Sequence, residues 1–132
     1  MVEKISFQGK LIALKVHQIA PGSVPITEPA QPLQIVTLKH PKGAYLKAHM
    51  HVPKRRVTSG LQECLIIRKG RIEVDLYSSQ KQFIKTIQVS SGEVLVLVKG
   101  GYGIRMLTEA EIVEVKNGPF VDGVEVLICN FT

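Results

Sequence analysis

Short runs of β-branched and apolar residues recur along the chain, and clusters of Gly, Pro, Ser or Asn separate them. Runs of about four to eight such residues between turn signals predict strands, and helical periodicity is almost absent. The expected strands are residues 10–17, 33–39, 44–51, 62–68, 71–77, 83–89, 93–98, 103–107, 111–116 and 124–129. The pattern therefore predicts an all-β protein.

Alternation within the expected strands says which side chains share a face, because successive residues of a strand point to opposite faces. In strand 44–51 one face carries polar and basic groups, namely Tyr45, Lys47, His49 and His51. The opposite face carries Leu46, Ala48 and Met50. In the next strand Glu63, Leu65 and Ile67 share one face, and Cys64 and Ile66 share the other.

The apolar stripe on the face away from the histidines needs cover. A sheet face exposed to water would carry polar residues. We therefore expect a second sheet or a partner subunit to cover this apolar face. We expect a homodimer that buries the stripe with help from the N-terminal arm, residues 1–17. Residues 71–76 alternate cleanly instead, and Glu73 and Asp75 are expected to be half exposed.

A chain of 132 residues is long enough to bury a core as one domain without disulfides. Within it, residues 1–32 are expected to form N-terminal strands and a connector with four prolines, and residues 33–132 a barrel. The two cysteines, Cys64 and Cys129, are expected to act as small core hydrophobes. No apolar run reaches the length of a membrane span and no signal-peptide pattern is present, so we expect a cytoplasmic protein.

The net charge of +6 favours anionic partners. The basic residues are scattered and only 5% of residues are aromatic, so nucleic acid is not expected as a partner, nor is a membrane. The one local run, Lys54-Arg55-Arg56, follows the histidine pair in a long loop. There it is placed to meet the phosphate or carboxylate of a small anionic ligand. Because Pro53, Ser59 and Gly60 break strand structure, residues 52–62 are expected to be a mobile loop at the mouth of a pocket.

One spacing carries the candidate chemistry: Gly43, five residues, His49-Met50-His51, and later Glu63, six residues and Gly70. Two imidazoles and a carboxylate suit Fe, Mn, Ni, Zn or Cu. The spacing resembles the first signature of the cupin superfamily, which implies a cupin-type double-stranded β-helix, or jelly-roll barrel, with His49, His51 and Glu63 as metal ligands. The family usually has three or four residues between the second histidine and the glutamate, whereas eleven, residues 52–62, intervene here.

The second cupin signature is degenerate in this chain. Its glycines align with Gly92, Gly100 and Gly103, but Val98 stands where the family has proline. The histidine that the family places there falls on Gly103, or on Tyr102 if the register slips by one residue. A phenol must lose its proton to bind a metal strongly, so metal affinity is expected to be lower than in a three-histidine cupin.

Three functions fit this pattern, and no sequence feature decides whether the protein is an enzyme. The first is a small metal-binding cupin that acts on an anionic or sugar-derived compound. The second is a metal-free sugar-nucleotide isomerase or epimerase, in which His49 or His51 is the general acid/base and Lys47 or Tyr102 assists. The third is a non-catalytic ligand-binding barrel. Substrate-binding candidates are Lys47, Arg55, Arg56 and Tyr102, and the remaining histidines, His17 and His40, are expected to be structural or exposed.

Overall fold

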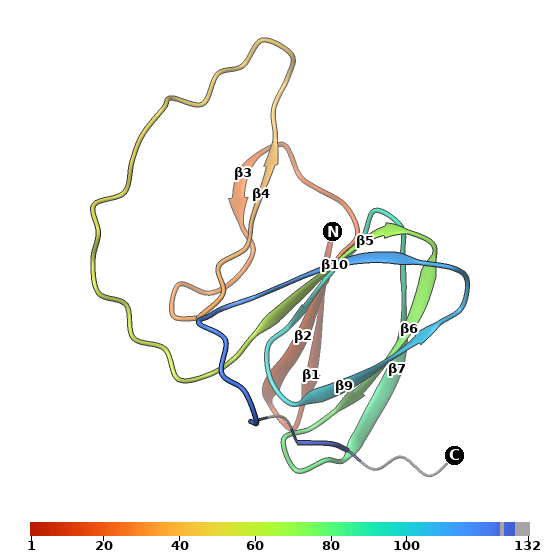
Figure 1. Cartoon of the computed structure of the whole chain (residues 1–132). Coiled ribbons are helices and arrows are strands. Elements are labelled where there is room, and N and C mark those ends of the chain that lie inside the picture. The colour runs from red at the N-terminus through yellow and green to blue at the C-terminus, as the bar shows by residue number, and fades with distance from the viewer. Residues whose placement is uncertain (125, 129–132) are drawn as a thin grey trace.

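The computed structural model of the protein describes residues 1–124 and 126–128. These residues form antiparallel sheets without a helix (Figure 1). The largest sheet has the order β1-β2-β8-β5-β10. Its strands are β1 (Val2–Phe7), β2 (Lys10–Val16), β8 (Val94–Leu97), β5 (Glu63–Lys69) and β10 (Glu111–Lys116). The all-β prediction is confirmed, and the sheets do not close into a barrel.

A second sheet packs against one face of the first and encloses the main core. Its order is β7-β6-β9, formed by β7 (Phe83–Ser90), β6 (Arg71–Tyr77) and β9 (Gly101–Met106). The core between the two sheets consists of fully buried aliphatic side chains such as Leu65, Ile67, Ile72, Val74 and Leu95. Alternation is the reason, because each of these strands turns every second side chain toward the other sheet.

The turn between β5 and β6 needs Gly70. This residue has a φ of 83°, and a Cβ atom there would collide with the carbonyl oxygen of Glu109. Only glycine adopts this conformation so close to another backbone. Gly70, the final glycine of the cupin-like spacing, therefore has a structural role. It allows the β5–β6 turn to lie directly against the turn before β10.

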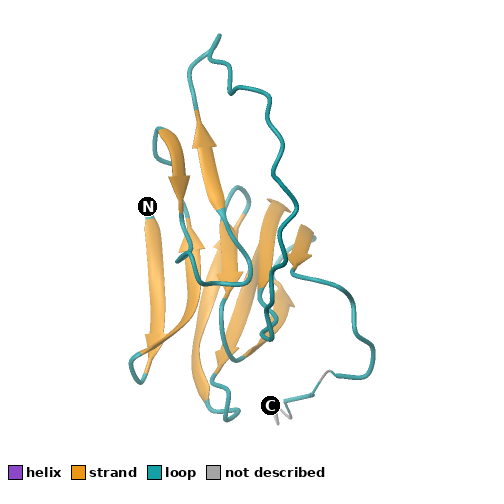
Figure 2. Cartoon of the chain, turned by 90° about the vertical axis from the view of Figure 1, so that its left-hand side faces the viewer, coloured by secondary structure: helices purple, strands orange, loops and turns teal. Residues whose placement is uncertain are grey.

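The outer face of the large sheet is partly covered by the chain itself. Leu14, Cys64 and Val96 form a second buried cluster, and Ile26 of the Pro-rich connector and Ile35, which follows it, pack on this cluster. The connector contributes β3 (Gly22–Pro25), which forms a hairpin with β4 (Val36–Lys39). Figure 2 shows this hairpin projecting beyond the end of the two larger sheets.

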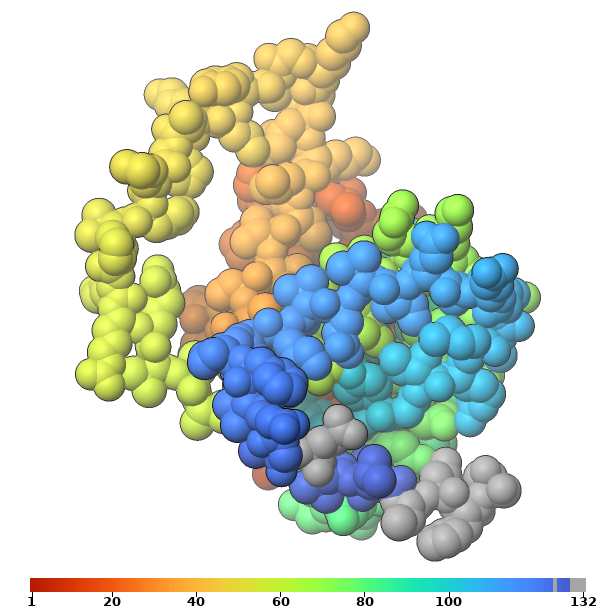
Figure 3. All heavy atoms as spheres, in the orientation of Figure 1, coloured from red at the N-terminus to blue at the C-terminus, as the bar shows by residue number. Residues whose placement is uncertain are grey.

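Residues 40–62 form one long extended segment between β4 and β5, and the expected strand 44–51 is wrong. Lys39 ends β4, and residues 41–43 turn the chain, with the Ala44 amide donating to the Pro41 carbonyl at 3.1 Å. From there the segment arcs away from the sheets, and Figure 3 shows open space between it and the hairpin. Within the described residues, no strand edge lies beside residues 44–51 to receive their backbone hydrogen bonds, so their alternating pattern does not produce a strand.

Most other strand predictions hold. The expected bounds of β6 and β10 are reproduced, and those of β2, β5, β7, β8 and β9 shift by one or two residues. The expected strand 124–129 includes residues 125 and 129, which lie outside the described residues, and residues 126–128 show no strand. Strands β1 and β3 lie in the N-terminal region where strands were expected without stated bounds, and β1 pairs antiparallel with β2. The described residues contain no helix long and apolar enough to cross a membrane.

Candidate functional site

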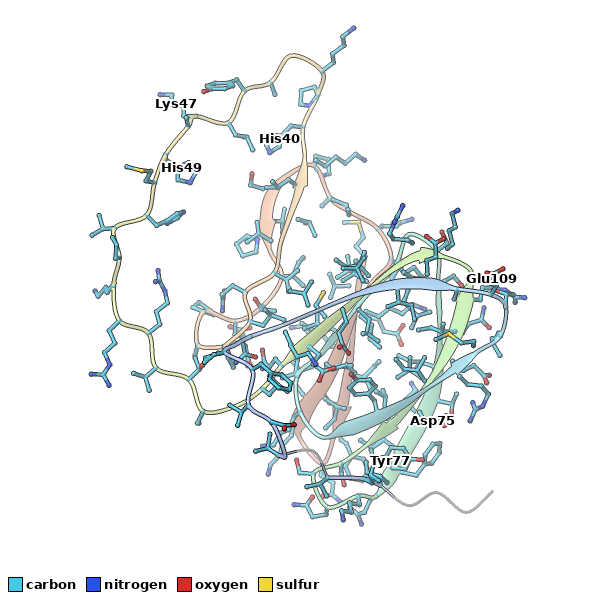
Figure 4. All side chains as sticks on the ribbon, viewed as in Figure 1. His40, Lys47, His49, Asp75, Tyr77 and Glu109 are labelled. Atoms are coloured by element: carbon cyan, nitrogen blue, oxygen red, sulfur yellow. The ribbon has the colours of Figure 1, made fainter. Side chains whose placement is uncertain are left out.

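The histidine pair lies on the segment 40–62, which is exposed from residue 40 to residue 61 (Figure 4). The ring centroids of His49 and His51 are 5.0 Å apart, and the ring planes meet at 70°. The Nδ1 atom of His49 lies 2.9 Å from the carbonyl oxygen of Lys47. A carbonyl oxygen can only accept a hydrogen bond, so this contact selects the tautomer with the proton on Nδ1. The Nε2 atom of His49 then carries the free lone pair.

Glu63 begins β5, and its side chain takes the face that points between the two sheets, as the alternation predicted. The hydroxyl of Tyr102 on β9 contacts Glu63 Oε2, and it also lies 3.0 Å from Glu114 Oε1 on β10. Lys116 Nζ lies 3.2 Å from the other oxygen of Glu114. The structure thus brings together two of the predicted site residues, Glu63 and Tyr102.

Glu114 is the member of this cluster that sequence reasoning missed. It stands opposite Leu65 in the β10–β5 ladder and therefore shares the inner face with Glu63 and Leu65. The signal was available in the sequence, because Ile112, Glu114 and Lys116 alternate with Val113 and Val115. A phenol carries one proton, so Tyr102 donates to one carboxylate at a time.

The structure does not bring the histidine pair and Glu63 together. Among the described residues, no group of three His, Cys, Asp or Glu side chains is placed to hold one metal ion. The reason lies in the backbone, since Glu63 is fixed in the sheet while His49 and His51 belong to the segment that leaves it (Figure 4). The structure therefore contains two separate groups of candidate residues, the imidazole pair and the Tyr102–Glu63–Glu114 cluster.

The basic candidates also lie on the exposed segment. Lys47, Arg55 and Arg56 are solvent-exposed, and Arg56 Nη1 donates to the Lys54 carbonyl at 3.2 Å. Within the part of the chain that the structure describes, none of the three forms an ion pair. Their charges therefore remain available to an anionic ligand.

The two histidines outside the motif differ from each other. His40 Nε2 lies 3.0 Å from the hydroxyl oxygen of Ser23, across the β3–β4 hairpin. His17 directly follows β2 and lines a cleft between that hairpin and the large sheet. Both are exposed, as the sequence analysis expected.

The expectation that Asp75 on β6 is half exposed is wrong. The side chain is buried, and the residue is 8% exposed. Thr86 Oγ1 donates to Asp75 Oδ1 at 2.6 Å, and Arg105 Nη2 donates to Oδ2 at 2.9 Å while its Nη1 holds Glu73. The hydrogen bond from Thr86 and then the Arg105 guanidinium hold the pKa of Asp75 below its usual range, against the opposing effect of burial. The two carboxylates in turn raise the pKa of Arg105. This network joins all three strands of the small sheet.

The apolar stripe behind the dimer prediction is not continuous in the structure. Leu46 and Met50 lie on the segment 40–62, whereas Cys64 is buried beneath the connector of the same chain. Burial raises the pKa of the Cys64 thiol, so it is expected to react slowly with alkylating reagents. The homodimer stays a prediction that rests on the residues still exposed, such as Ile66.

Comparison with known proteins adds no relative, because no protein-family model, no curated protein and no solved structure matches this chain.

Proposed function

We propose that this chain is a metal-binding protein of the cupin type, and that His49 and His51 are the primary ligands of a divalent transition metal. The observation that carries the proposal is the arrangement of the two imidazoles. Rings that share one ion at about 2.0–2.1 Å per nitrogen have centroids about 5 Å apart. The separation of 5.0 Å between the ring centroids of His49 and His51 fits that distance.

The hydrogen bond of His49 supports the same proposal. Histidines that bind metals commonly donate their other ring N–H to a carbonyl or carboxylate, which fixes the tautomer and orients the ring. The contact between His49 Nδ1 and the Lys47 carbonyl has this form. It leaves Nε2 as the atom that binds the ion.

Glu63 is the third ligand that the cupin resemblance implies, and its role is a separate question. Its carboxylate now contacts the Tyr102 hydroxyl, so it would have to exchange this partner to bind the ion. The imidazole pair alone supports weaker binding than three ligands. Such an ion would act as a Lewis acid, and Lys54, Arg55 and Arg56 on the same segment would attract an anionic compound to it.

Isothermal titration with Zn²⁺ and Ni²⁺ tests the proposal on protein made without a histidine tag and stripped with a chelator. We expect one ion per chain, and a loss of at least about tenfold in affinity for each of His49→Ala and His51→Ala. His40→Ala is the matched control, because this exposed histidine contacts Ser23 and not the pair. It should leave the affinity unchanged.

Glu63→Gln separates the two versions of the site. A loss of affinity similar to that of the histidine variants would make Glu63 a ligand, and an unchanged affinity would restrict the site to the imidazoles. If the wild-type chain binds no ion, or if His40→Ala weakens binding as much as His49→Ala, the proposal fails. The metal-free isomerase and the non-catalytic binding barrel would then be the functions to test.

A further inference from the structure

A cleft of about 700 Å³ separates the β3–β4 hairpin from the outer face of the large sheet. Its volume lies within the range of small-molecule sites in proteins, about 300–1,000 Å³. It is distinct from the imidazole pair and from the Tyr102–Glu63–Glu114 cluster, none of which lines it. This inference therefore does not depend on the proposed metal site.

Both walls of the cleft are apolar. On the sheet side the ladder aligns Val16, Val94 and Ile66 in neighbouring strands, with Val115 beside them on β10. On the hairpin side Val36 and Leu38 are more than half exposed. Cys64 of the second buried cluster and Ile35, which packs against that cluster, also line the cleft. Aliphatic surface in the cleft is thus exposed to water, and a bound ligand would cover this surface.

The polar lining adds two basic groups. Lys39 ends β4 opposite Gly22 in the hairpin ladder, and His17 follows Val16 at the end of β2. Among the described residues, neither side chain forms an ion pair. The net charge of +6 adds to the positive potential in the cleft. The cleft therefore offers an apolar trough and an unpaired cation at its rim.

We propose that this cleft binds one molecule of an aliphatic carboxylate, with its hydrocarbon chain between the hairpin and the sheet and its carboxylate at Lys39 and His17. Hydrocarbon matches the paired aliphatic walls, and a single negative charge matches the rim. A second copy of this chain fits less well, because a two-fold contact through the cleft would bring the same basic groups of both copies together.

Titration calorimetry with dodecanoate, kept below its micelle concentration, tests the proposal on the full chain. We expect one dodecanoate per chain and no binding of dodecyltrimethylammonium, whose head is positive. Ile66→Trp fills the cleft and should weaken binding by about tenfold or more. Ile104→Trp is the matched control, because Ile104 is also 37% exposed but lies on β9 outside the cleft. Val36→Trp fills the cleft from the hairpin side if the Ile66 variant does not fold.

The charge at the rim is tested separately. Lys39→Gln should weaken dodecanoate binding by about fivefold, as expected for one exposed ion pair. Lys85→Gln, an exposed lysine on β7, should leave it unchanged. The proposal is overturned if dodecanoate does not bind, if it binds as tightly to both cleft-filling variants, or if the cationic amphiphile binds equally well. Light scattering that shows a wild-type dimer converted to a monomer by Ile66→Trp would assign the cleft to a second copy and also overturn it.

Discussion

Strand β5 and the segment 44–51 are both predicted as strands but have opposite environments. The segment alternates apolar and polar residues, whereas β5 is apolar at four successive positions, residues 64–67. β5 lies between β8 and β10, which accept and donate its backbone hydrogen bonds, and its Leu65 is 1% exposed. The segment has no neighbouring strand within the described residues, and its Met50 is 94% exposed. An alternating pattern is compatible with a strand, but a neighbouring edge is needed to form one.

The two regions also differ in their charges. Charged residues of the sheets are largely paired, as in the contacts of Arg105 with Glu73 and Asp75. Residues 40–62 contain five basic residues and no acidic one. Unpaired charge contributes little to folding, so the sheets supply most of the stability while the charges of the segment stay exposed to solvent.

The largest difference is expected from matched truncations in the two regions. Leu65→Ala removes a fully buried side chain and should lower the free energy of unfolding by about 2–5 kcal/mol. Leu46→Ala, at a 53% exposed position on the segment, should change it by less than about 0.5 kcal/mol. Urea unfolding followed by circular dichroism measures both. Equal effects would mean that the segment packs against the core in solution.

A smaller effect is expected from the Asp75 network as the pH falls. The lowered pKa of Asp75 means that the folded state favours its carboxylate. That stability is complete above the unfolded-state value, about 3.9, and is lost as the pH falls through the lower folded-state pKa. Asp75→Asn should therefore be less stable than the wild type at neutral pH, and the difference should shrink in acid. If the stability difference between Asp75→Asn and the wild type stays constant from neutral pH to below pH 3, the Asp75 carboxylate does not cause the expected pH dependence.

The smallest effect on stability is expected from the basic run. Replacing Lys54, Arg55 and Arg56 together by Ala should leave the unfolding midpoint nearly unchanged, because all three side chains are exposed. The same variant should bind inorganic phosphate more weakly, with a smaller dependence on salt. Calorimetry at two salt concentrations measures this change. Should the triple variant unfold, the segment would be structural, and the comparison between the two regions would lose its basis.

The sequence alone determined the all-β class, most strand bounds and the face that Glu63, Leu65 and Ile67 share. The alternation of Glu63, Leu65 and Ile67 placed Glu63 between the sheets, and the aligned glycines selected Tyr102 as a neighbour of the site. Both inferences depend on period-two geometry, which is local to a strand and is therefore visible in sequence.

Only the tertiary structure decided which predicted strand found a partner and which side chains met across strands. Glu114 joins Tyr102 and Glu63 because β10 pairs with β5, and Asp75 is buried because Thr86 and Arg105 reach it from the strands on either side. The histidine pair is separated from Glu63 because residues 44–51 have no edge to pair with. Strand pairing joins residues distant in sequence, and its free energy depends on the neighbour as much as on the strand, so a single strand's pattern cannot determine it.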